Sequence, residues 1–215
     1  MEAATAMMTE DLKVADREEE ARTDREAGTE RPAGRGKKTA GGRGLIHIYC
    51  GDGKGKTTCG MGLCLRAAGA GMRVLIYQFM KDNSSSERQS MEHVPGVTLA
   101  RGPEKIKFSF RMTEEEKKEQ RAENGRKLKE LFRLAREKDF DVLFLDEAVY
   151  AAGAGVLPEE ELLGYLDRKP EKLEVILTGQ KPSEELCRRA DYITEMKKVK
   201  HPFDQGIGAR DGIER

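Results

Sequence analysis

The sequence contains no tryptophan, only three histidines and no excess of charge of either sign. Its 215 residues include 39 basic and 39 acidic side chains, so the formal net charge is zero. A protein that binds nucleic acid mainly by electrostatics usually carries a clear basic excess. The chain also has no apolar run near the roughly 20 residues that span a bilayer. These absences argue against a nucleic-acid partner and against a membrane-spanning protein.

Cysteine is scarce and shows no metal-binding pattern. The four cysteines are Cys50, Cys59, Cys64 and Cys187. They lack a Cys-x-x-Cys spacing, and with so few histidines they argue against a zinc site. The N-terminus carries Glu2, Glu10 and Asp11 where a secretory signal would have a basic start and an apolar stretch. We therefore expect a reduced, cytoplasmic protein.

The composition of the chain changes near residue 44. Residues 1–43 contain 10 acidic and 9 basic side chains, no aromatic residue, and only Leu12 and Val14 among Leu, Ile, Val and Phe. Such a segment cannot bury enough apolar surface to offset the entropy lost on ordering. We expect residues 1–43 to form a disordered charged tail and linker. A lid or partner-binding arm is the alternative interpretation.

Short apolar runs alternate with helical stretches through residues 44–215, which have the size of one domain. The expected strands are Ile46–Cys50, Val74–Phe79, Val97–Ala100, Val142–Asp146, Val175–Thr178 and Tyr192–Met196. The expected helices are Thr57–Ala70, Glu87–Met91, Thr113–Glu137, Pro158–Asp167 and Pro182–Ala190. This alternation predicts an α/β fold, with a mostly parallel sheet and helices on both faces. Ligands of such sheets bind beyond the carboxyl ends of the strands.

A glycine-rich loop joins the first expected strand to the first expected helix. It consists of Gly51, Asp52, Gly53, Lys54, Gly55, Lys56, Thr57 and Thr58. Glycines let backbone N–H groups converge on a phosphate, and the helix start adds partial positive charge. Lys56 can reach the outer phosphates and the Thr57 hydroxyl can ligate Mg²⁺. The loop predicts ATP binding, although the usual pattern G-x-x-x-x-G-K-[ST] would place glycine where this chain has Cys50.

Two carboxylates follow a second apolar run. Asp146 and Glu147 come after four apolar residues, at the end of a strand where the phosphate loop also lies. Mg²⁺ takes hard oxygen ligands and bridges substrate phosphates. We therefore predict that Thr57, Asp146 and Glu147 form a metal site, and which carboxylate binds directly stays open. A strand that ends in a helix cap would give the same pattern.

These two motifs predict Mg–ATP binding by a RecA-like P-loop NTPase fold, but they do not identify the acceptor. One candidate class is a small-molecule kinase or RecA-like ATPase that releases ADP. Another is a regulator that binds ATP without turnover. A nucleic-acid motor has no support, because aromatic stacking platforms are missing.

Further segments make the sequence similar to a known family. From about Gly44 to its end, the chain resembles the P-loop type of ATP:corrinoid adenosyltransferase. The motifs that carry the resemblance are the phosphate loop, Tyr77–Lys81, Asp146–Glu147, Leu177–Gly179, the tail segment Val199–Ile207, Ala209–Arg210 and Gly212–Glu214. The tail, with its sequence VKHPFDQGI, is the most specific of these.

The resemblance implies adenosyl transfer rather than phosphoryl transfer. In the family, Co(I) of a corrinoid attacks the 5′ carbon of ATP, and triphosphate leaves. Lys56 and Thr57 are the implied catalytic residues, because charge grows on the leaving triphosphate. The implied corrinoid is cobalamin or cob(I)yrinic acid a,c-diamide, and the implied metal is Mg²⁺. A homodimer and a flavoprotein reductant are the implied partners.

The segment Phe108-Ser109-Phe110 falls where the family has Phe-x-Trp beside the corrinoid. The resemblance implies that Phe108 and Phe110 help to displace the lower axial base of the cobalt. An extended segment would put both rings on one side. The alternative is that both rings pack under the long helix.

Three other positions follow or depart from the family pattern. His201 lies in the tail motif, and we expect it to order its loop through a hydrogen bond rather than to bind cobalt. Gln180 stands where relatives often have arginine, and residues 1–43 do not match the N-terminal helix of many relatives.

Overall fold

The computed structural model describes residues 42–103, 107 and 109–214. The expected tail, residues 1–43, lies outside these ranges except for its last two residues, and Phe108 lies outside them as well. The domain that the sequence predicts from residue 44 onwards is therefore described almost completely.

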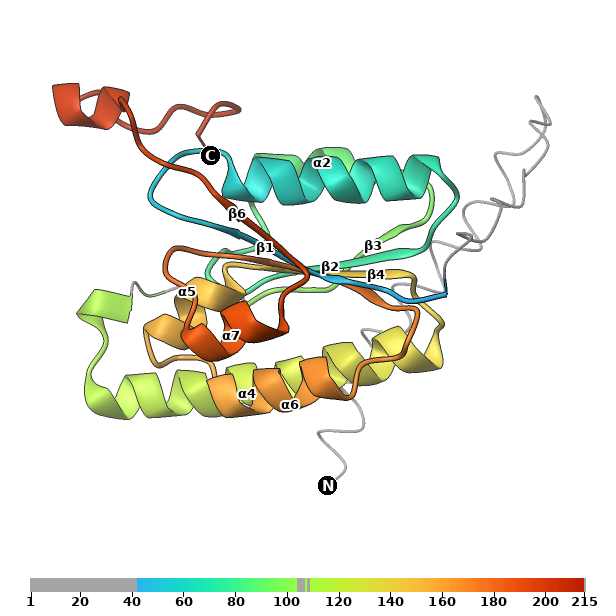
Figure 1. The fold of residues 1–215 in the computed structure, drawn as a ribbon. Coiled ribbons are helices and arrows are strands. Elements are labelled where there is room, and N and C mark those ends of the chain that lie inside the picture. The colour runs from blue at the N-terminus through green and yellow to red at the C-terminus, as the bar shows by residue number, and fades with distance from the viewer. Residues whose placement is uncertain (1–41, 104–106, 108, 215) are drawn as a thin grey trace. The chain divides into compact units, whose positions relative to one another are not determined.

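A parallel sheet forms the centre of the domain (Figure 1). Its strands in chain order are β1 (Ile46–Cys50), β2 (Val74–Gln78), β3 (Val97–Leu99), β4 (Val142–Asp146), β5 (Glu174–Thr178) and β6 (Tyr192–Glu195). Across the described part of the chain, the strand order is β3-β2-β4-β5-β1-β6, and every pairing between these strands is parallel. Strand β5 thus separates the strand before the phosphate loop from the strand that ends in Asp146.

Helices cover both faces of the sheet (Figure 1). On one face lie α2 (Lys56–Gly69) and α3 (Ser86–Met91), whose buried side chains share a core. On the other face lie α4 (Glu114–Glu137), α5 (Ala148–Gly153), α6 (Glu159–Asp167) and α7 (Glu184–Arg189). Two short 3-10 helices complete the fold, η1 (Ser109–Arg111) and η2 (Pro202–Gln205).

The strand sequences explain the two cores. Successive side chains of a strand point to opposite faces of the sheet. In β4, Val142 and Phe144 pack with α2, whereas Leu143 and Leu145 pack with the helices of the other face. All residues of β2 and β4 are buried, as expected for central strands of a parallel sheet.

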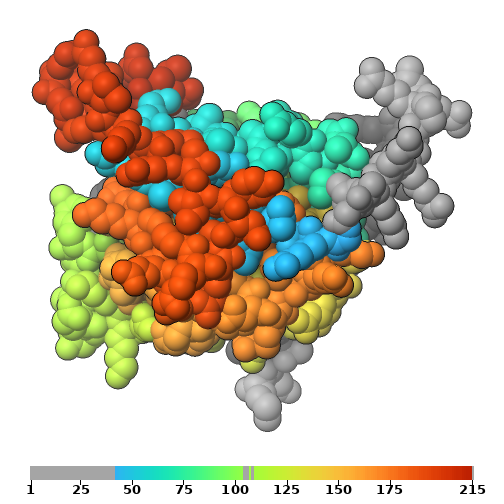
Figure 2. Space-filling model, viewed as in Figure 1, coloured from blue at the N-terminus to red at the C-terminus, as the bar shows by residue number. Residues whose placement is uncertain are grey.

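Strand β6 differs from these strands because it lies at the edge of the sheet. All of its residues are exposed, and the chain continues from it along the surface (Figure 2). Tyr192 and Ile193 are about half exposed. One ring is nevertheless held in place, since Tyr192 stacks on His47 of β1 with 4.6 Å between the ring centroids.

The predicted α/β fold, with a mostly parallel sheet and helices on both faces, is confirmed. Each expected strand and helix is present, with ends that differ by at most two residues. The start of α4 is capped as its sequence indicates. The Thr113 hydroxyl accepts a hydrogen bond from the Glu116 N–H at 3.2 Å, and the Glu116 carboxylate accepts one from the Thr113 N–H at 2.7 Å. Among the described residues no helix is both long and apolar enough to cross a bilayer.

Two local expectations differ from the structure. The apolar helix α5 was not expected, because it follows Glu147 directly with neither a polar face nor a side-chain cap. The expected extended segment around Phe110 is wrong where it is described. The chain forms the 3-10 turn η1 there, and the buried Ser109 hydroxyl lies 3.0 Å from the Tyr150 hydroxyl of α5.

Helix α2 offers a matched test of this packing. A Cβ atom added at Gly60 would lie 2.4 Å from Cζ of Phe144, whereas one at Gly62 would have no atom within 4 Å. We expect Gly60→Ala to lower the free energy of unfolding by roughly 1–3 kcal/mol through overpacking. Gly62→Ala should raise it by about 0.5–1 kcal/mol through helix propensity. Urea unfolding measures both, and equal effects of the two substitutions would contradict this packing.

Candidate functional site

The phosphate loop depends on close backbone contacts that only glycine allows. Gly51 has φ 102° and its N–H donates to the Gln180 carbonyl at 2.8 Å. The Gly53 N–H donates to the Met196 carbonyl at 2.7 Å. A Cβ atom at Gly51 would lie 2.4 Å from that same Met196 oxygen. The loop is therefore built against the chain that follows β6. Gly55, with φ 111°, then turns the chain into α2.

Helix α2 begins within the predicted phosphate-binding residues. The Lys56 ammonium donates to the Gly53 carbonyl at 2.7 Å, so it folds back over the loop. The Thr57 hydroxyl points towards the sheet and donates to Asp146 Oδ1 at 2.9 Å. Lys54 and Thr58 are exposed. The structure thus brings Thr57 together with a predicted metal ligand and leaves Lys54 and Thr58 at the surface.

Asp146 is the buried centre of this site. Its side chain is completely inaccessible to solvent. Besides Thr57, it accepts hydrogen bonds from the Thr178 hydroxyl at 2.6 Å and from the Gln78 amide at 3.0 Å. A buried carboxylate is costly unless it is paired and hydrogen-bonded. These donors reach Asp146 from α2, β5 and β2, so the sheet order itself assembles the site.

Glu147 lies beside Asp146 in an unusual conformation. Its φ of 59° is in the left-handed region, which a non-glycine residue seldom occupies. The Glu147 N–H donates to the Thr178 hydroxyl at 2.8 Å, which helps to hold this turn. Burial raises the pKa of the Glu147 carboxyl, and the negative charge of Asp146 raises it further. Strained, desolvated acidic groups of this kind are typical of functional sites.

A lysine from the loop between β2 and α3 reaches the same place. The Lys81 ammonium lies 3.2 Å from Asp146 Oδ2, 3.4 Å from the Thr57 hydroxyl and 2.8 Å from Glu87 Oε1. Burial by itself lowers the pKa of Lys81, but the carboxylates of Asp146 and Glu87 outweigh it and raise the pKa. The positive charge of Lys81 therefore offsets the negative charge of the buried Asp146 carboxylate.

The oxygen atoms of this site fit Mg²⁺ chemically. The Thr57 hydroxyl oxygen lies 2.9 Å from Asp146 Oδ1, and both oxygens are hard metal ligands. The Glu147 carboxylate lies close enough to Asp146 to feel its charge. Within the described ranges no three His, Cys, Asp or Glu side chains gather as a metal-binding group. A Mg²⁺ site does not need such a group, because Mg²⁺ usually keeps water and takes substrate phosphates as ligands alongside one or two carboxylates.

The C-terminal segment braces the phosphate loop. The Lys198 N–H donates to Asp52 at 2.8 Å, and this hydrogen bond lowers the pKa of the Asp52 carboxyl. His201 Nδ1 accepts a hydrogen bond from the Phe203 N–H at 3.1 Å, which confirms the expected loop-ordering role. At Gln180 the bond to the phosphate loop uses the main chain, so this contact does not depend on the side chain that differs from the family pattern.

The aromatic segment lies outside this polar network. Phe108 is not among the described residues. Phe110 is 75% exposed on η1, with the Arg111 guanidinium 5.6 Å from its ring centroid. The alternative that Phe110 packs under the long helix is therefore wrong. Because Ser109 is anchored to α5, which directly follows Glu147, the segment is tied to the same end of the sheet.

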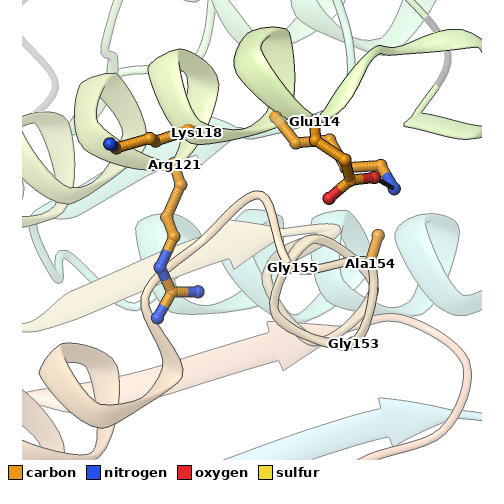
Figure 3. A pocket seen from close by; sticks show the side chains of 7 residues that line it. Glu114, Lys118, Arg121, Gly153, Ala154 and Gly155 are labelled. Carbon is orange, nitrogen blue, oxygen red and sulfur yellow. Dashed lines mark hydrogen bonds and ion pairs between the residues drawn. The ribbon is translucent and has the colours of Figure 1, made fainter.

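A separate cavity of about 420 Å³ opens between α4 and the turn after α5 (Figure 3). Its lining residues are Glu114, Lys117, Lys118, Arg121, Gly153, Ala154 and Gly155. Two of its cations are already paired, Lys117 with Glu114 at 2.8 Å and Arg121 with Glu160 at 2.8 Å. None of the predicted site residues that the structure describes lines this cavity, so we do not assign the function to it.

Sequence reasoning missed several residues of the site. Thr178 and Gln78 had appeared only as members of the motifs that carry the family resemblance. The contact of Met196 with the phosphate loop had no sequence signal, because it joins residues far apart in the chain. A polar residue at the end of an apolar strand is the sequence pattern that could have indicated Thr178 and Gln78.

Thr178 gives the most direct test of the buried site. We expect Thr178→Val to lower the free energy of unfolding by roughly 1–3 kcal/mol, because Asp146 loses a donor and the Glu147 N–H loses its acceptor. ATP binding should weaken as well. Thr98→Val, on the exposed side of β3, should change stability by less than about 0.5 kcal/mol. Denaturant unfolding and calorimetry measure these effects, and a fully stable Thr178→Val protein with normal ATP affinity would refute the assignment.

The chain is similar to known proteins over most of its length. The model of the ATP:corrinoid adenosyltransferase BtuR/CobO/CobP family matches residues 42–215. The corrinoid adenosyltransferase of Escherichia coli K12 is 30% identical over 172 residues, which cover 80% of this chain and 86% of that protein. The corrinoid adenosyltransferase of a Sinorhizobium species is 34% identical over 180 residues, 80% of each chain. That of Salmonella typhimurium LT2 is 30% identical over 172 residues, 80% of this chain and 86% of that protein. This chain belongs to the ATP:corrinoid adenosyltransferase family.

Proposed function

We propose that this protein transfers the 5′-deoxyadenosyl group of ATP to Co(I) of a corrinoid and releases triphosphate. The observation that carries this proposal is the family match across residues 42–215, which includes every described residue of the phosphate loop and of the Asp146 site. The loop ahead of α2 would supply hydrogen-bond donors to a triphosphate leaving group, and Asp146 would hold the Mg²⁺ that offsets its charge. The corrinoid is cobalamin or cob(I)yrinic acid a,c-diamide.

The reaction needs alignment and charge neutralisation rather than a protein base. Co(I) supplies the electron pair for the new cobalt–carbon bond, and the bond between C5′ and its oxygen breaks, so the pair leaves on the triphosphate. The chain must hold C5′ in line with cobalt and stabilise the growing negative charge. Lys56, which donates to the Gly53 carbonyl in this arrangement, is the cation that we propose turns onto this charge.

The donors for the triphosphate are expected mainly at the start of α2. The N–H groups of Gly51 and Gly53 already bond to the carbonyls of Gln180 and Met196. The first N–H groups of a helix have no partner within it, and the helix dipole favours an anion there. This assigns phosphate binding to the Lys56–Thr57 end of the loop more than to its first glycines.

Mg²⁺ would neutralise part of the triphosphate charge when it is bound. Thr57 and Asp146 are the residues that would hold it, with Glu147 beside them. The Thr178 and Gln78 hydrogen bonds fix the Asp146 carboxylate in one orientation. We also propose, from the family resemblance, that the protein is a cytoplasmic homodimer and that a flavoprotein is its reductant.

The corrinoid would contact Phe110, which follows the Ser109 anchor on α5. An exposed aromatic ring on an anchored turn can cover the flat lower face of a corrin and exclude the axial base. Loss of that donor ligand lowers the energy of the reduced cobalt. The rival function, a kinase or ATPase that releases ADP, would use the same loop and carboxylates but would leave Phe110 without a role.

The product of the reaction distinguishes these functions. We expect anaerobic mixing with chemically reduced cob(I)alamin and Mg–ATP to give a light-sensitive alkylcobalamin and triphosphate. Lys56→Ala should lower the rate at least about 100-fold, because a donor to the leaving group is lost. Lys129→Ala, an exposed position on α4, is the control. The corrinoid absorption spectrum and phosphate analysis give the answer, and ADP with an unchanged cobalt spectrum would contradict the proposal.

The corrinoid role of Phe110 makes a separate prediction. We expect Phe110→Ala to slow the reaction of cobalamin roughly tenfold more than that of a corrinoid without the lower base, a difference of about 1.4 kcal/mol. Phe110→Trp, which matches the family pattern, should retain activity with both. Steady-state rates on the two substrates measure the ratio. Equal losses with both corrinoids would rule out this role.

A further inference from the structure

Lys81 occupies the same small space as the proposed metal ligands. Its ammonium lies 3.2 Å from Asp146 Oδ2 and 3.4 Å from the Thr57 hydroxyl, the two groups that would hold Mg²⁺. The Lys81 side chain is 29% exposed, whereas that of Asp146 is fully buried. The lysine is therefore the solvent-accessible member of this ion pair.

A divalent cation on Asp146 would change the surroundings of this ammonium. A Mg²⁺ ion held by Thr57 and Asp146 would share the carboxylate that the Lys81 ammonium already contacts at 3.2 Å. Two cations that share one carboxylate repel each other strongly in a partly buried site. The contact between Lys81 and Asp146 and a metal contact to the same carboxylate are thus in competition.

Side-chain hydrogen bonds hold the loop that carries Lys81. Asn83 makes two hydrogen bonds with Gly102, accepting from its N–H at 2.7 Å and donating to its carbonyl at 3.2 Å. Ser85 donates to the Gln78 side chain at 3.0 Å. Lys81 precedes both of these residues, and its side chain has a flexible four-carbon stem and three N–H donors. Glu87, 2.8 Å from the ammonium, can keep one donor while the others turn elsewhere.

We propose that Lys81 is a second triphosphate-binding lysine, which neutralises Asp146 in the arrangement seen here and turns onto the triphosphate when a divalent cation binds Thr57 and Asp146. It would then face the leaving group together with Lys56, from a different element of the fold. This inference rests on the proposed function for the identity of the leaving group. Binding of metal and of triphosphate can be measured without any corrinoid.

The proposal predicts opposite effects of one substitution. Lys81→Met removes the competing cation, so Mn²⁺ should bind more tightly in the absence of nucleotide, by roughly 3- to 10-fold. The same substitution removes a charged donor, so inorganic triphosphate in the presence of Mg²⁺ should bind roughly tenfold more weakly. A residue with a merely structural role would weaken both or neither.

Both affinities are measured on the full chain. The paramagnetic resonance signal of free Mn²⁺ reports metal binding, and titration calorimetry reports triphosphate binding. Lys129→Met removes the same charge from the exposed face of α4 and should change neither affinity. Lys81→Gln keeps a donor for Glu87 and should show the same two signs, so the test does not depend on the folding of one variant.

The outcomes separate this inference from the proposed function. Tighter Mn²⁺ binding with weaker triphosphate binding supports the role of Lys81. Parallel losses, no change, or a wild-type protein that binds no triphosphate would overturn it. If Lys81→Met tightens Mn²⁺ binding and weakens triphosphate binding, but the wild-type protein forms no alkylcorrinoid, the proposed function is refuted and the Lys81 inference stands.

Discussion

The buried charge of Asp146 is the constraint on which the rest of the site depends. A carboxylate with no solvent exposure must be matched by donors and by a cation, or the fold loses several kcal/mol. Thr57, Gln78 and Thr178 meet this need from α2, β2 and β5. The position of β5 between β1 and β4 therefore matters chemically, because it places a hydroxyl between the phosphate loop and the carboxylates. The cation is Lys81, which the loop after β2 delivers.

The phosphate loop has a second constraint, which comes from the end of the chain. The N–H groups of Gly51 and Gly53 donate hydrogen bonds to carbonyls outside the loop. The Met196 carbonyl also lies too close to Gly51 for any side chain there. The tail motif, which is the most specific part of the sequence, is thus linked to the loop through Met196 and Lys198. His201 orders that tail locally, so its presence needs no role as a ligand of cobalt.

The sequence predicted the parts of the structure that depend on local pattern. Buried parallel strands read as apolar runs, the Thr113–Glu116 pair marked the start of α4, and the glycine loop lay between a strand and a helix. The missed parts depend on distant contacts or on a single anchor. One example is the Thr178 hydroxyl of β5, which donates to Asp146 of β4. Another is the turn at Ser109, whose hydroxyl contacts Tyr150 of α5. Residues 1–41 and Phe108 lie outside the described ranges, so the expected tail and the first aromatic residue stay predictions.

Our account requires that the bond broken in ATP lies between C5′ and its oxygen. The most direct measurement is carbon NMR of the reaction of cob(I)alamin with ATP that carries ¹³C at C5′. We predict that the labelled carbon loses its bond to oxygen and appears as an alkyl carbon on cobalt, with ³¹P signals of triphosphate. A labelled carbon that stays bonded to oxygen in ADP would contradict the account, because the same loop and carboxylates would then serve phosphoryl transfer.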